Sequence, residues 1–202
     1  MKAFLYSHYL EQKHFDALRK LLGKSKASKA LFIITAAVPY GLDPRPVWLD
    51  ESLVDMRQFA EKVDEITFEG EPDLKDLSQY DFIFVSGGNA FYLAYRLAET
   101  SMDEMLKKYI TNGGIYCGSS AGGVILMDNI EHFTPVDDAT KAPAIYPGLG
   151  LIDFAFIPHA DNKKYAEGMR AVADKYEQVG KEVILVNDNQ AVIIDGSKRE
   201  LV

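Results

Sequence analysis

The sequence has 202 residues but only one cysteine, Cys117, so no disulfide can form within the chain. Such sparse cysteine is typical of proteins from a reducing compartment. No apolar run approaches the roughly 18 residues of a membrane span. Residues 1–10, MKAFLYSHYL, are too short and too polar for the apolar core of a secretory signal. These absences predict a cytoplasmic protein that does not work at a membrane.

Basic residues are also in short supply. Lys and Arg number 22 against 30 Asp and Glu, which gives a formal net charge of −8. Neutralising phosphates requires a basic surplus, so nucleic acid is excluded as a main partner. The sequence has no G-x-G-x-x-G motif and no G-x-x-x-x-G-K-[ST] loop, and its His and acidic residues lack the spacing of a ligand set. We therefore expect neither a cofactor nor a metal.

Short apolar runs alternate with amphipathic stretches along the chain, which is 48% hydrophobic. The pattern predicts strands at 2–8, 29–38, 64–70, 80–89, 113–120, 151–160, 182–188 and 190–196, and helices at 11–24, 51–63, 90–100, 102–112, 121–128 and 163–178. Such alternation indicates an α/β protein with three layers, a mostly parallel sheet and helices on both faces. Without a linker or repeat, residues 1–202 are expected to form a single domain.

Residues 116–123 read YCGSSAGG and follow an apolar run. The stretch fits G-x-S-x-G, the nucleophile elbow, with Ser120 as its central residue. Ser119 cannot be central, because positions 117 and 121 are not glycine. A strand-to-helix elbow strains its central residue, and the small residues Gly118, Ala121 and Gly122 leave room for that turn. The pattern predicts Ser120 as a nucleophile at a helix N-terminus.

Hydrolysis at such a serine also needs donors for the oxyanion. The N–H of Ala121, directly after the serine, is one candidate. The strand end SGGN (86–89) is expected to supply the second, from Gly88 or, as the other option, Gly87, because glycine lets a backbone N–H approach a substrate closely.

The serine further needs a base and an orienting acid. His159 follows the apolar run LIDFAFIPHA (151–160), so it should reach the same sheet edge as the elbow. Several acids lie between the serine and this histidine: Asp128, Glu131, Asp137, Asp138 and, within a strand, Asp153. The residues alone do not select among them.

Five stretches together resemble the peptidase E family of serine peptidases, which includes aspartyl dipeptidases and cyanophycinases. They are GGNAFYL (87–93), GGIYCGSSAGGVIL (113–126), VDDATKAP (136–143), GLGLIDF (148–154) and IPHADN (157–162). The resemblance implies a fold like class I glutamine amidotransferases, which is flavodoxin-like. It also implies Ser120 as nucleophile, His159 as base, Gly88 and Ala121 as oxyanion donors, and Asp137 as the third member of the triad.

The family resemblance further implies an exopeptidase, a dipeptidase that prefers an acidic N-terminal residue. A protein of net charge −8 repels acidic ligands, so a local cation must compensate. Lys163, Lys164 and Arg170 are available, and we choose Arg170 because its planar fork binds both carboxylate oxygens. Asn89, at the end of SGGN, is a second candidate for substrate binding. Short peptides are the expected partner of a monomer or homodimer.

Other functions remain open at this point. An α/β-hydrolase esterase or another amidase would carry the same elbow, although its elbow usually comes earlier in the chain. A glutamine amidotransferase would have cysteine at the elbow, whereas Cys117 comes three residues too early. A catalytically silent binding protein on the same fold is a further alternative, because fold does not fix function.

Overall fold

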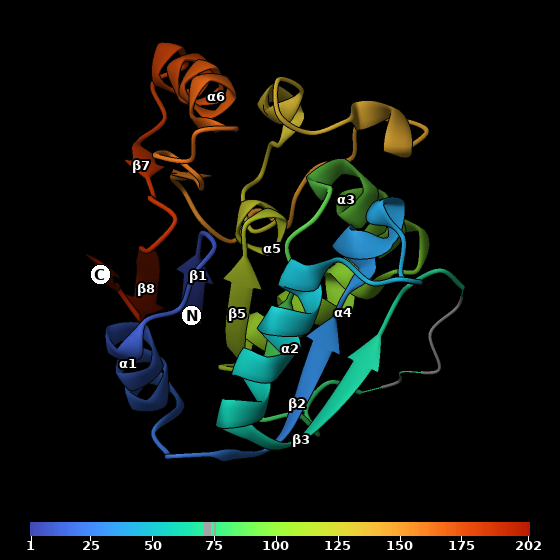
Figure 1. Cartoon of the computed structure of the whole chain (residues 1–202), viewed down its shortest axis with the longest axis vertical. Helices are drawn as coiled ribbons and strands as arrows, with labels where there is room; N and C mark the ends of the chain where they lie inside the picture. Colours follow the sequence, from blue (N-terminus) through green and yellow to red (C-terminus); the bar gives the residue numbers. More distant parts are fainter. Residues whose placement is uncertain (71–73, 75) are drawn as a thin grey trace.

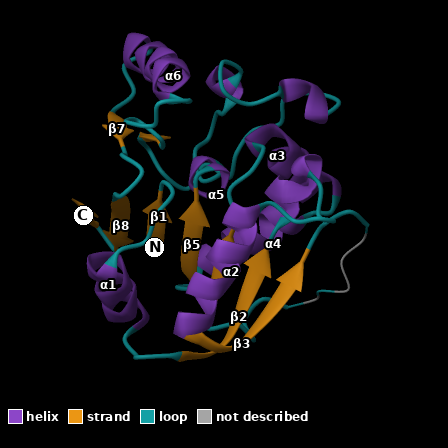
Figure 2. Ribbon diagram, viewed as in Figure 1, coloured by secondary structure: helices purple, strands orange, loops and turns teal. Residues whose placement is uncertain are grey.

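The computed structural model describes residues 1–70, 74 and 76–202, and its elements alternate between strands and helices (Figure 1; Figure 2). The strands are β1 (Lys2–Tyr6), β2 (Ala27–Ile33), β3 (Ala60–Ile66), β4 (Phe82–Val85), β5 (Ile115–Ser119), β6 (Ala155–Ile157), β7 (Val183–Leu185), β8 (Ala191–Asp195) and β9 (Lys198–Leu201). The helices are α1 (Gln12–Leu22), α2 (Val47–Phe59), α3 (Ala90–Glu99), α4 (Met102–Thr111), α5 (Ala121–Val124) and α6 (Ala166–Gln178). Three 3₁₀ helices are η1 (Thr35–Tyr40), η2 (Glu131–Phe133) and η3 (Ala139–Lys141).

Seven strands form one mixed sheet in the order β3-β2-β4-β5-β1-β8-β9. The first five are parallel to one another, whereas β8 pairs antiparallel with β1 and the edge strand β9 pairs antiparallel with β8. The predicted mostly parallel sheet of an α/β protein is confirmed. Because the carboxyl ends of parallel strands share one edge, the segments after β1, β4 and β5 meet there.

Helices cover both faces of this sheet. Side chains alternate along each strand, so Phe4 and Tyr6 of β1 face one side and Ala3 and Leu5 the other. The first side packs against α1 and α2, and the second against α3, α4 and α5. In Figure 1, α2 crosses in front of the sheet while α4 lies behind it. The buried side chains on each face fix the sheet between its two helical layers.

The predicted strand 151–160 does not join the main sheet. Its observed part, β6, pairs in parallel with β7 in a separate two-stranded sheet, with Ala155 opposite Val183. Pairing continues beyond both strands, since Val186 N–H donates to Ile157 O at 2.9 Å and Ala160 N–H to Val186 O at 3.1 Å. The segments that follow β6 and β7 therefore lie side by side.

Two predicted elements are shorter than expected. The apolar run 29–38 leaves the strand after Ile33 and continues as η1. The helix predicted over 121–128 has a single α-helical turn, α5. The carbonyls of Ile125, Leu126 and Met127 accept hydrogen bonds from the N–H groups of residues 149–152 rather than continuing a helical ladder. These carbonyls are therefore not available to accept the hydrogen bonds of a longer helix.

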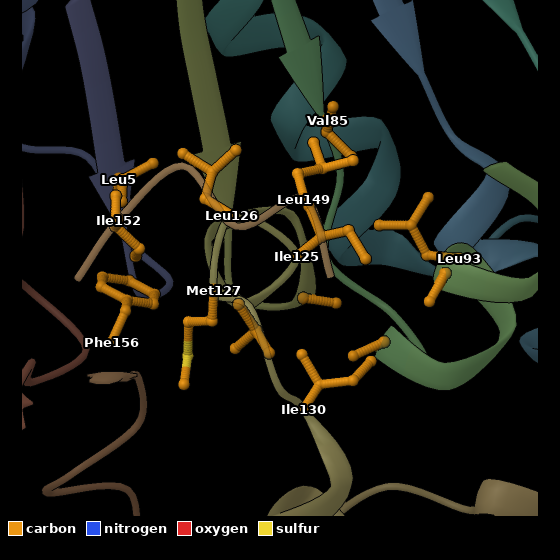
Figure 3. Close-up of a cluster of buried hydrophobic side chains, with 14 of the residues drawn as sticks. Leu5, Val85, Leu93, Ile125, Leu126, Met127, Ile130, Leu149, Ile152 and Phe156 are labelled. Carbon is orange, nitrogen blue, oxygen red and sulfur yellow. The ribbon is translucent and has the colours of Figure 1, made fainter. Parts of the chain in front are cut away.

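The segment behind the elbow is buried in apolar side chains. Figure 3 shows Ile125, Leu126 and Met127 among a cluster that also includes Leu5, Val85, Leu93, Ile130, Leu149, Ile152 and Phe156. This packing holds the short helix α5 rigidly against the sheet. In the part of the chain that the structure describes, no helix has the length and apolar character needed to cross a membrane.

Candidate active site

Ser120 occupies a strained turn between β5 and α5. Its φ of 46° and ψ of −110° lie outside the regions that non-glycine residues ordinarily adopt. The turn is tight: a Cβ on Gly118 would lie 2.4 Å from Gly122 O, and one on Gly122 would lie 2.2 Å from Val85 O. Ser120 N–H donates to Tyr6 O of β1 at 2.9 Å. The elbow geometry predicted from G-x-S-x-G is therefore present, with Ser120 at its tip.

His159 follows β6 and also has a positive φ, 58°. Its backbone N–H donates to Ser7 Oγ at 2.7 Å, which ties this turn to the end of β1. The ring points at the elbow, with Nε2 2.9 Å from Ser120 Oγ. At this distance the imidazole can accept the hydroxyl proton. The sequence expectation that His159 meets Ser120 agrees with this geometry.

The carboxylate on the other side of His159 is Asp188. His159 Nδ1 lies 2.6 Å from Asp188 Oδ1. Ser7 Oγ donates to the same oxygen at 3.2 Å, and Asn162 Nδ2 donates to Asp188 Oδ2 at 2.6 Å. Both oxygens are thus held, and the carboxylate fixes the tautomer and direction of the imidazole. Asp137 was predicted for this position; the structure puts Asp188 there instead.

Asp188 was missed because only acids between the serine and the histidine were considered. It follows β7, which pairs in parallel with the strand that precedes His159. The two strands therefore deliver both side chains to one edge. The run EVILVND (182–188) already showed an apolar strand ending in polar residues, and that signal could have found Asp188.

Burial and hydrogen bonding shift the pKa values of His159 and Asp188 in opposite directions. Burial lowers the pKa of His159 below its ordinary value, and Asp188 offsets only part of this effect. For Asp188, burial favours the neutral acid, but hydrogen bonds from Asn162 and His159 outweigh it and hold the pKa below its ordinary value. At neutral pH the site therefore contains a neutral imidazole beside a carboxylate. This is the protonation state that a general base requires.

The predicted oxyanion donors flank the serine. A Cβ on Gly87 would lie 3.4 Å from Ser120 Cβ, so the end of β4 touches the elbow. Gly88 has a φ of 136°, and a Cβ there would lie 2.0 Å from Ala36 O, so this position accepts only glycine. Among the described residues, the N–H groups of Gly88 and Ala121 donate no hydrogen bond. Both remain available to a ligand.

Ser120 and His159 line one cavity. Its volume is about 810 Å³ when the space at its open entrance is included. The other lining residues are Ser7, His8, Tyr40, Trp48, Ser52, Gly87, Gly88, Ser119, Val136, Asp137, Asn162, Tyr165 and Met169. The lining mixes small polar residues and glycines with the aromatic side chains of Tyr40, Trp48 and Tyr165, and among the described residues Asp137 is its one carboxylate.

The family model described as peptidase family S51 matches residues 5–202. The chain belongs to peptidase family S51.

Relatives of this S51 chain are named as peptidases. An uncharacterized peptidase of Pasteurella multocida is 28% identical over 98% of this chain and 99% of its own length. An uncharacterized peptidase of Listeria monocytogenes is 34% identical, but the alignment spans only 60% of each protein. A crystal structure from Listeria monocytogenes, described as a candidate peptidase E, covers 100% of this chain and 97% of that one with a TM-score of 0.79 and 23% identity. The structural likeness shows the fold.

Asp137 has a different environment from the one expected in the S51 chain. Its Oδ2 accepts a hydrogen bond from Ala90 N at 2.8 Å, at the start of α3, and no hydrogen bond joins it to His159. Burial raises the pKa of Asp137 to about 6, despite the opposing bond from Ala90. The neighbouring Asp138 is exposed and accepts from Thr140 N at 2.9 Å. Neither acid orients the imidazole.

Of the other candidate acids, Asp153 is exposed and precedes β6 rather than lying in a strand, and the remaining two pair elsewhere. Asp128 forms an ion pair with Lys181, and a Glu131 oxygen lies 3.8 Å from His132 Nε2.

Asn89 and Arg170 were predicted to bind substrate, and the structure gives both another role. Asn89 is buried beneath the cavity lining: its Oδ1 accepts from Tyr92 N at 2.8 Å as the N-cap of α3, and its Nδ2 donates to Asp138 O at 3.0 Å. Arg170 lies on the exposed face of α6, 2.6 Å from Asp174 Oδ1 and 2.9 Å from Glu177 Oε2. Helix spacing, rather than a ligand, accounts for these pairs.

We expect Arg170→Ala to leave substrate choice unchanged, because the guanidinium is outside the cavity and already paired. The ratio of kcat/KM for Asp-Leu to that for Leu-Leu should be the same in the native and variant proteins. Steady-state hydrolysis of both dipeptides measures it. A variant that loses Asp-Leu cleavage alone would show that Arg170 does reach the substrate.

One group of described residues could hold a metal ion. One ligand atom each from His8, His159 and Asp188 lies within 4.8 Å of the others. His8 Nδ1 lies 3.9 Å from Asp188 Oδ2. A metal here would take the carboxylate and the imidazole away from Ser120. A bound metal and the hydrogen-bond chain from Ser120 to Asp188 would therefore compete for the same side chains.

Proposed function

We propose that this S51 peptidase is a serine-dependent exopeptidase, a dipeptidase acting on short peptides. The observation that carries the proposal is the hydrogen-bond chain from Ser120 through His159 to Asp188, with distances of 2.9 Å and 2.6 Å. A hydroxyl, an imidazole and a carboxylate in this order are the parts of a serine-hydrolase triad.

In the acylation step, Ser120 Oγ attacks the peptide carbonyl while His159 Nε2 takes its proton. The N–H groups of Gly88 and Ala121 stabilise the oxyanion that forms. His159 then returns the proton to the leaving amine, and the C–N bond breaks to give an ester on Ser120. The same imidazole then takes a proton from water, which attacks this ester; the imidazolium returns that proton to Ser120 Oγ as the ester C–O bond breaks and the acid is released. Asp188 keeps Nδ1 protonated in both steps.

Among the described residues, the cavity lining itself has no cation to bind an acidic first side chain. Its aromatic residues Tyr40, Trp48 and Tyr165 suit an apolar group, whereas none of the described lining residues is Lys or Arg. Lys164 Nζ donates to Tyr165 Oη at 2.9 Å, so this cation contacts one of the lining residues. The acidic preference implied by the resemblance therefore has Lys164, rather than Arg170, as its available partner.

Covalent labelling tests the proposal. A fluorophosphonate should modify Ser120 in the native protein, as identified by peptide mass spectrometry, and a dipeptide panel (Asp-Leu, Glu-Leu, Asn-Leu, Leu-Leu) should be hydrolysed. Labelling without peptide cleavage would favour the esterase or amidase alternative. A folded protein that is neither labelled nor active would be the silent binding protein.

A further inference from the structure

One carboxylate in the cavity wall takes no part in the hydrogen bonds that join Ser120, His159 and Asp188. Asp137 lies in the wall of the cavity that also contains Ser120. Its backbone is fixed, because its N–H donates to Phe133 O at 2.9 Å. One carboxylate oxygen, Oδ2, accepts from Ala90 N. No donor among the described residues reaches the other oxygen, Oδ1, which is therefore available to a ligand.

This carboxylate also lacks a positive partner. No Lys or Arg is found in the described part of the cavity lining, and no ion pair of Asp137 occurs among the described residues. A half-buried anion without a counter-charge is costly, and a cationic ligand would remove that cost. The N–H of Ala90 and the start of α3 favour the ionised form. The cavity thus offers a fixed negative site to a positively charged group.

The position of this site is tied to the reacting centre. Ala90, which holds Asp137, lies two residues after Gly88, the candidate oxyanion donor. In a peptide, the α-amino nitrogen is two bonds from the first carbonyl carbon. A carboxylate oxygen bonded to that nitrogen then lies at most about 6 Å from the carbon. Asp137 lines the same cavity as Gly88 and Ser120 and is held two residues after Gly88, so its carboxylate is a candidate partner for the amino group of the residue whose carbonyl is attacked.

We propose that Asp137 binds the free α-ammonium group of the substrate and so limits cleavage to the first peptide bond. This inference rests on the proposed function of Ser120. It identifies the substrate class as short peptides with an unblocked N-terminus. The aromatic residues Tyr40, Trp48 and Tyr165 provide the surroundings for the ammonium and the first side chain.

Protection of Ser120 by boronic acids tests the inference without knowledge of the natural substrate. Leucine boronic acid, which has a free amino group, and its N-acetyl derivative compete with a fluorophosphonate for Ser120 in the native protein. The free amine should protect at an at least about tenfold lower concentration, the size expected of a hydrogen bond to a charged group. In Asp137→Asn, which can still accept from Ala90 N–H, this preference should disappear.

The matched control is Asp138→Asn, one residue along, whose exposed carboxylate only caps η3. It should keep the full preference for the free amine. Thermal unfolding of all three proteins checks that the fold is intact. Equal protection by both boronates in the native protein, or a preference that survives in Asp137→Asn, would overturn the inference while labelling of Ser120 still supported the proposed function. Absence of labelling in the native protein would refute both.

Discussion

Ser120→Ala is expected to lower kcat by at least about 10³-fold, because the variant has no oxygen to form the acyl intermediate. Alanine keeps a Cβ at the same φ of 46°, so the strain of the elbow is unchanged and only the hydroxyl is lost. Steady-state hydrolysis of the dipeptide panel measures the effect. Thermal unfolding should give the same midpoint for the native and variant proteins.

Ser119→Ala is the matched control. Ser119 is the adjacent hydroxyl, buried at the end of β5, where its Oγ makes a long 3.4 Å contact to Ser7 O and also interacts with the buried Tyr6 hydroxyl. Its loss should change kcat by less than about tenfold, in line with a weak hydrogen bond. A folded Ser120→Ala protein with near-native turnover, or a Ser119→Ala protein with the larger defect, would contradict the assignment of Ser120.

Those parts of the site that depend on local sequence could be predicted. G-x-S-x-G specifies a tight turn because each glycine faces a backbone atom at a distance that no Cβ tolerates, as Gly118 and Gly122 do here. The apolar run before His159 indicated a strand end, but β6 lies in a separate two-stranded sheet, and the hydrogen bond from His159 N–H to Ser7 Oγ brings the histidine to the end of β1. The mostly parallel sheet followed from the same alternation of strands and helices.

The parts of the site that depend on contacts between distant segments could not be predicted from the sequence. Asp188 comes 29 residues after His159, and only the pairing of β6 with β7 makes them neighbours. Arg170 was chosen for its charge and its place in the chain, but the helix turns it towards Asp174 and Glu177. Asn89 looked like a polar group at a strand end, and it caps the helix that follows. Sequence order carries no information on which way such side chains point.

Asp188→Asn is expected to lower kcat by about 10⁴-fold, the effect of the corresponding change in other triads, where the amide stabilises the wrong imidazole tautomer. The side chain volume is preserved, and the amide oxygen of the variant could still accept from Ser7 or Asn162, so the fold should be retained. Asp138→Asn, a change of the same kind at an exposed acid, should leave kcat unchanged. Steady-state kinetics on a dipeptide substrate compare the three proteins.

The pH profile separates a positioning role of Asp188 from a merely structural one. The carboxylate favours the imidazolium, so it raises the pKa of His159 against the larger lowering by burial. Removing its charge should lower that pKa further. Since the acid limb of kcat/KM reports protonation of the base in the free enzyme, the limb should move to lower pH in Asp188→Asn. A large fall in kcat with an unmoved acid limb would mean that Asp188 does not act through His159, and a near-native kcat would return the search for the third residue to Asp137.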